Sequence, residues 1–329
     1  MPELRKDPVL GRWVIVSTER VRRPADFAVA RSPRRPGPCP LCPGREAATP
    51  PALLELPPDA GTVGWSVRVV PNKFPALRIE GDLGRRGQGL YDLMNGVGAH
   101  EVVVESPDHD DDLGTMSVAA IDRMLGAVQT RMLDLQRDTR FRSILYVRTR
   151  GLPAGPHLDH PHGQLLATPV VPLLLATELL HARTYHDYRE RCLFCDIVRQ
   201  EVAERERVVV ASPHAIAFAP FASARPFAVW IMPRRHAARF PGVLPAERAE
   251  IAAALRTVVQ KLDALLGPLP LTIELHGAPV GEDESPSFHW HLELVPTTSP
   301  VGEVVPSPEF PLNPLPPEDA ARLLRDATP

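Results

Sequence analysis

The chain contains the run Asp159-His160-Pro161-His162-Gly163-Gln164, which is followed by the short apolar stretch 165–168. Pro161 fixes its own φ and disfavours helical torsions at His160, so we expect an extended segment that leads into a buried strand. In an extended chain the side chains of His160, His162 and Gln164 point to the same face. A neutral imidazole is a nucleophile that can leave again once it is phosphorylated. The run therefore predicts a segment that binds and attacks a phosphate, although a bare His-x-His pair also occurs on ordinary surfaces.

Length and composition restrict the class of protein. A chain of 329 residues with 44% hydrophobic and 23% charged residues is long enough for two domains or one large domain of an ordinary soluble protein. The net charge of -3 gives no overall basic field, which disfavours general nucleic-acid binding but leaves room for a local phosphate-binding patch. No apolar run approaches the roughly 20 residues of a membrane span, and residues 1–7 lack the apolar core of a secretion signal. We expect a cytoplasmic protein without a membrane partner.

The four cysteines fall into two pairs, Cys39/Cys42 and Cys192/Cys195. In a reducing compartment such pairs bind metal or carry out redox chemistry more often than they form structural disulfides. The 39 prolines are concentrated near residues 33–58 and 296–317. We expect irregular surface segments there and no strands.

The same order of features occurs twice along the chain, which predicts an internal duplication. Each copy has a cysteine pair, strand-like segments of which the last ends in a histidine, a helical pattern and a His-x-His pair. The first copy comprises Cys39/Cys42, residues 66–74 and 100–109, and His160/His162; the second comprises Cys192/Cys195, residues 207–218 and 227–236, and His289/His291. The strand-end histidine precedes the His-x-His pair by 51 residues in the first copy and by 53 in the second.

Apolar residues recur at helical spacing over residues 117–138 and 245–266, between those landmarks. We assign both stripes to plain core packing. Each half is thus predicted to be α+β, with antiparallel strands covered by one long helix. We expect the halves to be residues 1–178 and 179–329.

Each half supplies two cysteines and two histidines as candidate metal ligands. They are Cys39, Cys42, His109 and His160 in the first half, and Cys192, Cys195, His236 and His289 in the second. Two thiolates and two imidazoles suit tetrahedral Zn²⁺, and a filled four-ligand shell is typical of a structural site. A redox pair or two buried thiols is the alternative, but the prolines beside Cys39 and Cys42 do not suit the helix start that a thioredoxin-like pair needs. In the second half His276 and His291 compete with His289 as ligands, and its site could hold zinc or iron or remain empty.

Several of these motifs, taken in order, resemble the galactose-1-phosphate uridylyltransferases of the histidine-triad superfamily. The matching segments are the catalytic run 159–164, Cys39/Cys42, Ser106-Pro107-Asp108-His109, residues 72–76, residues 13–17 with 20–24, residues 275–279 and residues 288–291. The resemblance covers nearly the whole chain. It implies a duplicated histidine-triad-like fold, a homodimer, and a nucleotide sugar and a sugar phosphate as the binding partners.

The resemblance also implies a double displacement. His162 would attack the α-phosphorus of a nucleotide sugar, release sugar 1-phosphate and carry the nucleotide to a second phosphorylated acceptor. His160 would ligate a structural zinc ion and hold the strand of His162 in place. Gln164, Arg20 and Arg23 would hydrogen-bond the phosphate oxygens, while Asn72 and Phe74 would line the nucleoside pocket. The two arginines could equally be surface charges, Asn72 a turn residue and Phe74 a core residue.

The chain departs from the family pattern in two places. Thr149 and His157 stand where family members commonly have an asparagine and a serine, so His157 either contacts phosphate in place of the serine or is simply exposed. The segment that serves the hexose is reduced to Gly302-Glu303. The second cysteine pair, together with the tail that contains Asn313-Pro314 and Pro317-Glu318, resembles the divergent branch that includes ADP-glucose phosphorylase, which uses the same nucleotidyl-histidine with inorganic phosphate as acceptor.

Three functions remain open on the sequence alone. The first is a nucleotidyltransferase of the uridylyl or the adenylyl kind. The second is a catalytically silent nucleotide-binding module. The third is a hydrolase that uses the same histidine with water as acceptor. The base, the sugar and the acceptor are not fixed by the residues.

Overall fold

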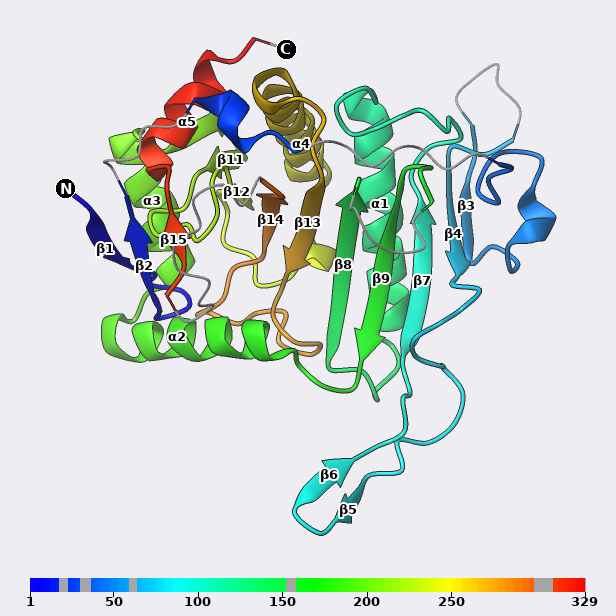
Figure 1. Ribbon diagram of the computed structural model, residues 1–329. Coiled ribbons are helices and arrows are strands. Elements are labelled where there is room, and N and C mark those ends of the chain that lie inside the picture. Colours follow the sequence, from blue (N-terminus) through cyan, green and yellow to red (C-terminus); the bar gives the residue numbers. More distant parts are fainter. Residues whose placement is uncertain (18–22, 30–36, 59–63, 152–157, 299–309, 329) are drawn as a thin grey trace.

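The computed structural model describes residues 1–17, 23–29, 37–58, 64–151, 158–298 and 310–328 (Figure 1). Ten strands form one continuous sheet in the order β10-β11-β12-β14-β13-β8-β9-β7-β4-β3, and every neighbouring pair is antiparallel. The strands are β3 (Leu54–Leu56), β4 (Val67–Pro71), β7 (Ala99–Val104), β8 (Ser143–Arg150), β9 (His162–Thr168), β10 (Val208–Ala211), β11 (Ala215–Phe218), β12 (Val229–Pro233), β13 (Leu271–His276) and β14 (His291–Pro296).

The order of strands is mirrored about the junction between β8 and β13. Reading outward from that junction, the first half gives β8-β9-β7-β4-β3 and the second gives β13-β14-β12-β11-β10. The equivalent strands follow one another in the same order along the chain, so the topology confirms the predicted α+β class and the duplication. The division expected between residues 178 and 179 falls within the helix Leu173–Arg189 and stays a prediction.

The two half-sheets join edge to edge, which the sequence did not indicate. Tyr146 to Arg150 of β8 pair with residues 271–275 of β13. Each strand is the edge of its own half-sheet and would otherwise expose unpaired backbone groups, so the pairing satisfies both edges at once. His162 and Gln164 in β9 therefore lie one strand away from the junction with the second half.

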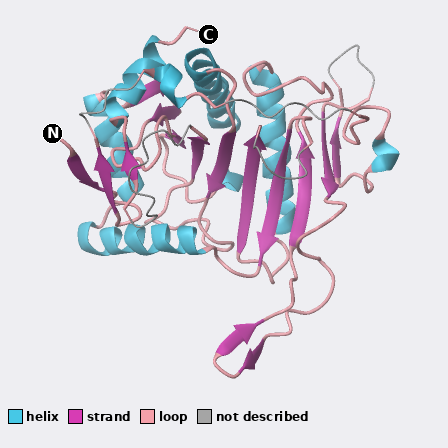
Figure 2. Ribbon diagram, viewed as in Figure 1, coloured by secondary structure: helices cyan, strands magenta, loops and turns pink. Residues whose placement is uncertain are grey.

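Two long helices cover one face of this sheet (Figures 1 and 2). They are α1 (Val118–Leu135) and α4 (Pro245–Leu266), as the apolar stripes predicted. Ser117 caps α1 by accepting a hydrogen bond from the backbone N–H of Ala120, and Pro245 occupies the first turn of α4. The apolar faces of both helices and of both half-sheets belong to one hydrophobic core, so each half is stabilised by burial against the other.

Among the remaining elements, the helices over residues 173–189 and 193–204 pack with Phe218 and Trp230 on the face of the second half-sheet opposite α4. The helices are α2 (Leu173–Arg189), α3 (Leu193–Glu204) and α5 (Pro317–Asp326), with the short η1 (Pro24–Phe27), η2 (Glu46–Ala48) and η3 (Phe240–Gly242). A three-stranded sheet contains β1 (Glu3–Lys6), β2 (Trp13–Val16) and β15 (Leu312–Asn313). The hairpin of β5 (Arg86–Gln88) and β6 (Tyr91–Leu93) projects away from the large sheet.

The expectation that residues 33–58 and 296–317 hold no strands was wrong. β3 lies in the first range and β15 in the second. Both are very short edge strands, the position in a sheet where neighbouring prolines cost no ladder hydrogen bond. Among the described residues, no helix combines the length and the apolar character needed to cross a bilayer.

Candidate functional site

The strand β9 presents His162 and Gln164 on the face of the sheet opposite the long helices. Its burial alternates: His162 and Gln164 are half-buried, whereas Gly163 and Leu165 are buried on the helix side. The predicted extended conformation and shared face are therefore confirmed for His162 and Gln164, whereas Asp159 and His160 form a bend ahead of the strand.

A hydrogen bond fixes the tautomer of His162. Its Nδ1 lies 2.8 Å from the backbone carbonyl oxygen of His160, which can only accept, so Nδ1 carries the proton. The lone pair of the neutral ring is then on Nε2. His162 is thereby poised to act as a nucleophile through Nε2.

Gln164 contacts a histidine that the sequence did not single out. The Oε1 atom of Gln164 lies 2.6 Å from Nε2 of His100 on β7, and Nδ2 of Asn72 lies 3.1 Å from the same nitrogen. The Oδ1 atom of Asn72 accepts from the backbone N–H of Phe74 at 2.9 Å. The structure therefore brings Asn72 and Gln164 together around His100.

The other residues predicted to bind substrate are Phe74, Arg23, Arg20 and His157, and the structure describes only the first two of them. The Phe74 side chain is 83% exposed, so it is not the core residue of the alternative interpretation. Arg23 is exposed and its backbone N–H donates to Asp26 at the start of η1; within the described ranges no contact joins Arg23 to His162 or Gln164. Arg20 and His157 lie outside the described residues.

The first predicted metal cluster is assembled beside the catalytic strand. Cys39, Cys42, His109 and His160 each offer a ligand atom, and these atoms lie within 4.8 Å of one another. The Sγ atom of Cys42 lies 3.4 Å from Nδ1 of His109 and 3.6 Å from Nδ1 of His160. A tetrahedral zinc ion with bonds of about 2.3 Å to sulfur and about 2.0 Å to nitrogen separates those atoms by about 3.5 Å, so the spacing fits zinc.

The surroundings of His160 also suit a metal ligand. Its Nε2–H donates to the carbonyl oxygen of Ser106 at 2.8 Å, which leaves Nδ1 to face the sulfur atoms. Burial lowers the pKa of His160, which favours the neutral ring that binds a cation. Because the His160 carbonyl binds Nδ1 of His162, this cluster would also position the His162 ring.

The second predicted cluster repeats this geometry in the other half. The Sγ atom of Cys195 lies 3.3 Å from Nδ1 of His236 and 3.5 Å from Nδ1 of His289, and Nε2 of His236 lies 3.0 Å from the carbonyl oxygen of Ser285. A hydrogen bond from Cys195 lowers the pKa of Cys192 to about 3, while the same contact raises the pKa of Cys195.

A third cluster contains the two histidines that competed with His289. Glu178, His276, His291 and Glu293 bring four possible ligand atoms within 4.8 Å of one another. The Nδ1 atom of His276 lies 2.9 Å from Oε1 of Glu178, and Nε2 of His291 lies 3.6 Å from Oε1 of Glu293. Two carboxylates and two imidazoles could hold a harder cation than the thiolate sites. Sequence reasoning missed both glutamates.

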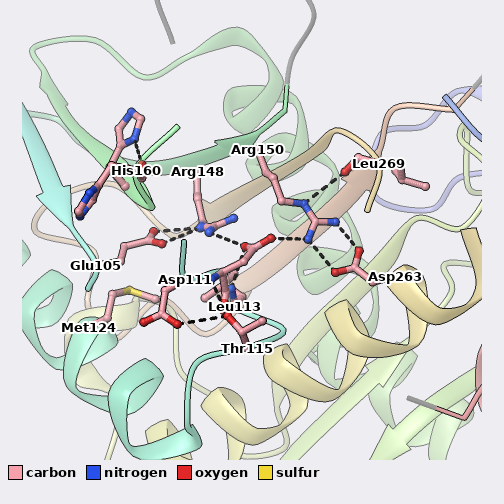
Figure 3. A network of polar contacts seen from close by, with 12 residues as sticks. Glu105, Asp111, Leu113, Thr115, Met124, Arg148, Arg150, His160, Asp263 and Leu269 are labelled. Carbon is pink, nitrogen blue, oxygen red and sulfur yellow. Dashed lines mark hydrogen bonds and ion pairs between the residues drawn. The ribbon is translucent and has the colours of Figure 1, made fainter. Parts of the chain in front are cut away.

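A buried ionic network lies beneath the catalytic strand (Figure 3). Arg148 donates to Glu105 at 3.0 and 2.8 Å and to Asp112 at 2.8 Å, while Arg150 pairs with Asp112 and with Asp263 of α4. Burial raises the pKa of Asp112, but the charges of Arg148 and Arg150 outweigh burial and lower this pKa to about 2. The network ties β8 to the helix of the second half.

The ring of Tyr146 fills the space below Gly163. Its hydroxyl donates to Glu105 at 2.9 Å, and a Cβ atom on Gly163 would lie 2.4 Å from Cε2 of the ring. The glycine between His162 and Gln164 is therefore required by a close approach of Tyr146. Burial and the charge of Glu105 raise the pKa of Tyr146 well above its usual value.

Comparisons with known proteins find matches over nearly the whole chain. Residues 1–172 match the family model of the galactose-1-phosphate uridyl transferase N-terminal domain, and residues 178–298 match that of the C-terminal domain. An ADP-glucose phosphorylase from Arabidopsis thaliana is 33% identical over 99% of this chain and 93% of its own length. A galactose-1-phosphate uridylyltransferase from Thermotoga maritima is 29% identical over 99% of this chain and 98% of its own length.

Two solved structures share the fold at similar coverage. The crystal structure of an Arabidopsis thaliana ADP-glucose phosphorylase with bound ADP-glucose superposes with a TM-score of 0.84 at 32% identity, over 100% of this chain and 99% of that one. A structure of uridylyltransferase superposes with a TM-score of 0.75 at 27% identity, over 99% and 98% of the two chains.

Proposed function

The chain belongs to the galactose-1-phosphate uridylyltransferase family of nucleotidyltransferases, and from that membership we propose that it carries out nucleotidyl transfer through His162. The donor is a nucleotide sugar such as UDP-glucose, and the acceptor is a sugar 1-phosphate. The observation that carries this proposal is the hydrogen bond between Nδ1 of His162 and the His160 carbonyl, which leaves the nucleophilic lone pair on Nε2.

In the first step Nε2 of His162 attacks the α-phosphorus of the donor. The new Nε2–P bond forms as the bond from phosphorus to the bridging oxygen breaks, and sugar 1-phosphate leaves with the bonding electrons. The imidazole ring gains positive charge, and the Nδ1–H bond to the His160 carbonyl strengthens as that charge develops. In the second step a phosphate oxygen of the acceptor attacks the same phosphorus and His162 leaves as the neutral ring.

The other residues near the catalytic strand bind substrate in this proposal. Gln164 donates to the phosphate oxygens on which charge accumulates, and Asn72 and Phe74 contribute to the nucleoside pocket. Arg20, Arg23 and His157 remain proposed phosphate ligands on the strength of the family resemblance.

The thiolate clusters are proposed to hold structural zinc. Cys39, Cys42, His109 and His160 would hold one ion, and Cys192, Cys195, His236 and His289 a second. In such a site zinc supplies folding energy and fixes the orientation of its ligands, without an open coordination position for catalysis. At the first site that orientation includes the backbone carbonyl of His160, which binds His162.

A second candidate function is phosphorolysis of an ADP-sugar, with inorganic phosphate as acceptor. It shares the first step and differs in the base and in what attacks the intermediate. Two observations favour it: the 33% identity to an ADP-glucose phosphorylase, and the higher TM-score to the ADP-glucose complex than to the uridylyltransferase, 0.84 against 0.75.

Intact-mass measurement after incubation with UDP-glucose or ADP-glucose tests both candidates. A mass increase of one uridylyl or adenylyl group identifies the base, and subsequent discharge by galactose 1-phosphate or by inorganic phosphate identifies the acceptor. His162→Gly should abolish the adduct, whereas the exposed His214→Gly should leave it unchanged. Failure to form an adduct with any bound nucleotide sugar would instead indicate a silent binding module, and release of nucleotide by water alone would indicate a hydrolase.

A further inference from the structure

We propose that His100 is a positioning residue that turns the amide NH₂ group of Gln164 toward the phosphate. This inference rests on the proposed function, in which Gln164 contacts the transferred group. A glutamine amide has two nearly isosteric orientations that present either two donors or a lone-pair-bearing oxygen. Only the first orientation attracts an anionic phosphate oxygen, so the orientation itself decides whether Gln164 assists the reaction.

The protonation of the His100 ring follows from its backbone partner. The N–H of Ala76 donates to Nδ1 of His100 at 3.1 Å, so Nδ1 is the unprotonated nitrogen of the neutral ring. The proton is consequently on Nε2, which lies 2.6 Å from Oε1 of Gln164. This short Nε2–H···Oε1 hydrogen bond occupies the amide oxygen and leaves the NH₂ group for the ligand side.

The sheet register brings the two residues together. Gln164 of β9 lies opposite Val102 of β7, and His100 is two residues from Val102 on the same face. Such a diagonal pair is within reach of long side chains. The contact therefore joins two adjacent central strands and does not depend on a loop.

A second amide lies beside the same ring, and the backbone N–H of Phe74 orders it. The Oδ1 atom of Asn72 is engaged by the N–H of Phe74, and its Nδ2 lies 3.1 Å from Nε2 of His100. The single proton on Nε2 is directed at Gln164, so the approach of the Asn72 NH₂ group to Nε2 is a contact between two donors and not a hydrogen bond. The amide oxygens of Asn72 and Gln164 are both occupied, which leaves both NH₂ groups to donate to a ligand. The result is a pair of amide donors, which is suited to an anionic ligand.

Two substitutions separate the contacts of His100. In His100→Asn the side-chain oxygen can replace Nδ1 as the acceptor for Ala76, but the donor to Gln164 is lost. In His100→Gln the terminal NH₂ group can replace Nε2 as the donor to Gln164. We expect His100→Asn to slow single-turnover adduct formation about 10- to 100-fold with little change in donor affinity, and His100→Gln to recover to within about threefold of the wild type.

The effect should depend on Gln164. In a Gln164→Ala background, His100→Asn should slow adduct formation by less than about twofold, because the group through which it acts is gone. An equal slowing in both backgrounds, or no slowing in either, would overturn the inference.

The ring protonation can be measured without turnover. In ¹⁵N-histidine NMR spectra, with the His100 signals identified by their loss in His100→Asn, we expect a proton on Nε2 whose shift changes in Gln164→Ala. A proton on Nδ1, or an Nε2 chemical shift that is the same in the wild type and in Gln164→Ala, would refute the positioning role even if no nucleotide sugar were turned over. Absence of an adduct in the wild type would refute the proposed function alone.

Discussion

Replacing Gly163 by alanine should disrupt the packing of Tyr146 beneath strand β9. The added Cβ atom would lie 2.4, 2.5 and 2.6 Å from Cε2, Oη and Cζ of Tyr146, where ordinary contact begins at 3.4 Å, so the ring must move by roughly 1 Å. Tyr146 is only 2% exposed and cannot turn into solvent. Its displacement also stretches the hydrogen bond from its hydroxyl to Glu105.

The expected loss of stability combines two effects. Overpacking a buried site costs about 1–3 kcal/mol, and weakening a buried hydrogen bond to a charged group costs about 1.5–3 kcal/mol. We therefore expect Gly163→Ala to lower the free energy of unfolding by roughly 3–5 kcal/mol in urea titrations. The matched control is Gly87→Ala in β5, where no atom lies within 4 Å of the added Cβ and no comparable loss is expected.

A double-mutant cycle identifies the cause. In a Tyr146→Leu background the obstructing ring is absent, so Gly163→Ala should cost less than about 1 kcal/mol, and the two changes should couple by about 2 kcal/mol or more. If the costs add to within about 0.5 kcal/mol, or if Gly163→Ala is as mild as Gly87→Ala, the close approach of Tyr146 is not what requires glycine at this position.

Further predictions concern the metal clusters and the buried charges. Cys42→Ser should remove one equivalent of zinc and slow adduct formation about 10- to 100-fold, whereas Cys195→Ser should remove one equivalent from the second cluster and slow adduct formation only a few-fold. Metal analysis measures the bound zinc, and intact mass measures the adduct. Equal slowing in the two variants would contradict the proposed role of the first cluster. Because the pKa of Asp112 is lowered to about 2, its ionised form should stabilise the fold by about 2 kcal/mol above pH 4, and this contribution should be lost as the pH falls toward 2. Asp112→Asn should accordingly be less stable at pH 7, with a difference from the wild type that shrinks below pH 4; a constant difference would count against the ionic origin.

The elements that could be predicted from the sequence are those whose signals are local. The stripe of apolar residues that became α1 is continuous in the chain, and so is the apolar pattern of α4. The residues of β8 gave no such signal, because Arg148 and Arg150 place charges on its buried face and are neutralised by partners from distant segments. The junction between the half-sheets was missed for the same reason.

In the candidate site, too, residues with a local sequence signal were predicted, and contacts between distant segments were missed. The two thiolate clusters were predicted because paired cysteines and repeated histidine spacing are visible in the chain, and the structure assembles both. Glu178 lies 98 residues from His276 and carries no motif of its own, so their contact is visible only in the fold. His100 lay within a predicted strand, but its contact with Gln164 depends on the register between β7 and β9.

The equivalent positions of the two halves explain why nucleotide chemistry is proposed for the first half. His291 begins β14 as His162 begins β9, and its Nδ1 lies 3.2 Å from the His289 carbonyl, which repeats the orienting hydrogen bond. However, His291 is 0% exposed and its ring centre lies 4.7 Å from that of Trp230, so no phosphate can approach it. Glu293 also occupies the position of Gln164, and a carboxylate there would repel a phosphate and attract a cation. The duplicated scaffold thus preserves the means of orienting a histidine in both halves, while within the described residues the first half alone combines it with a partly exposed ring and a glutamine amide.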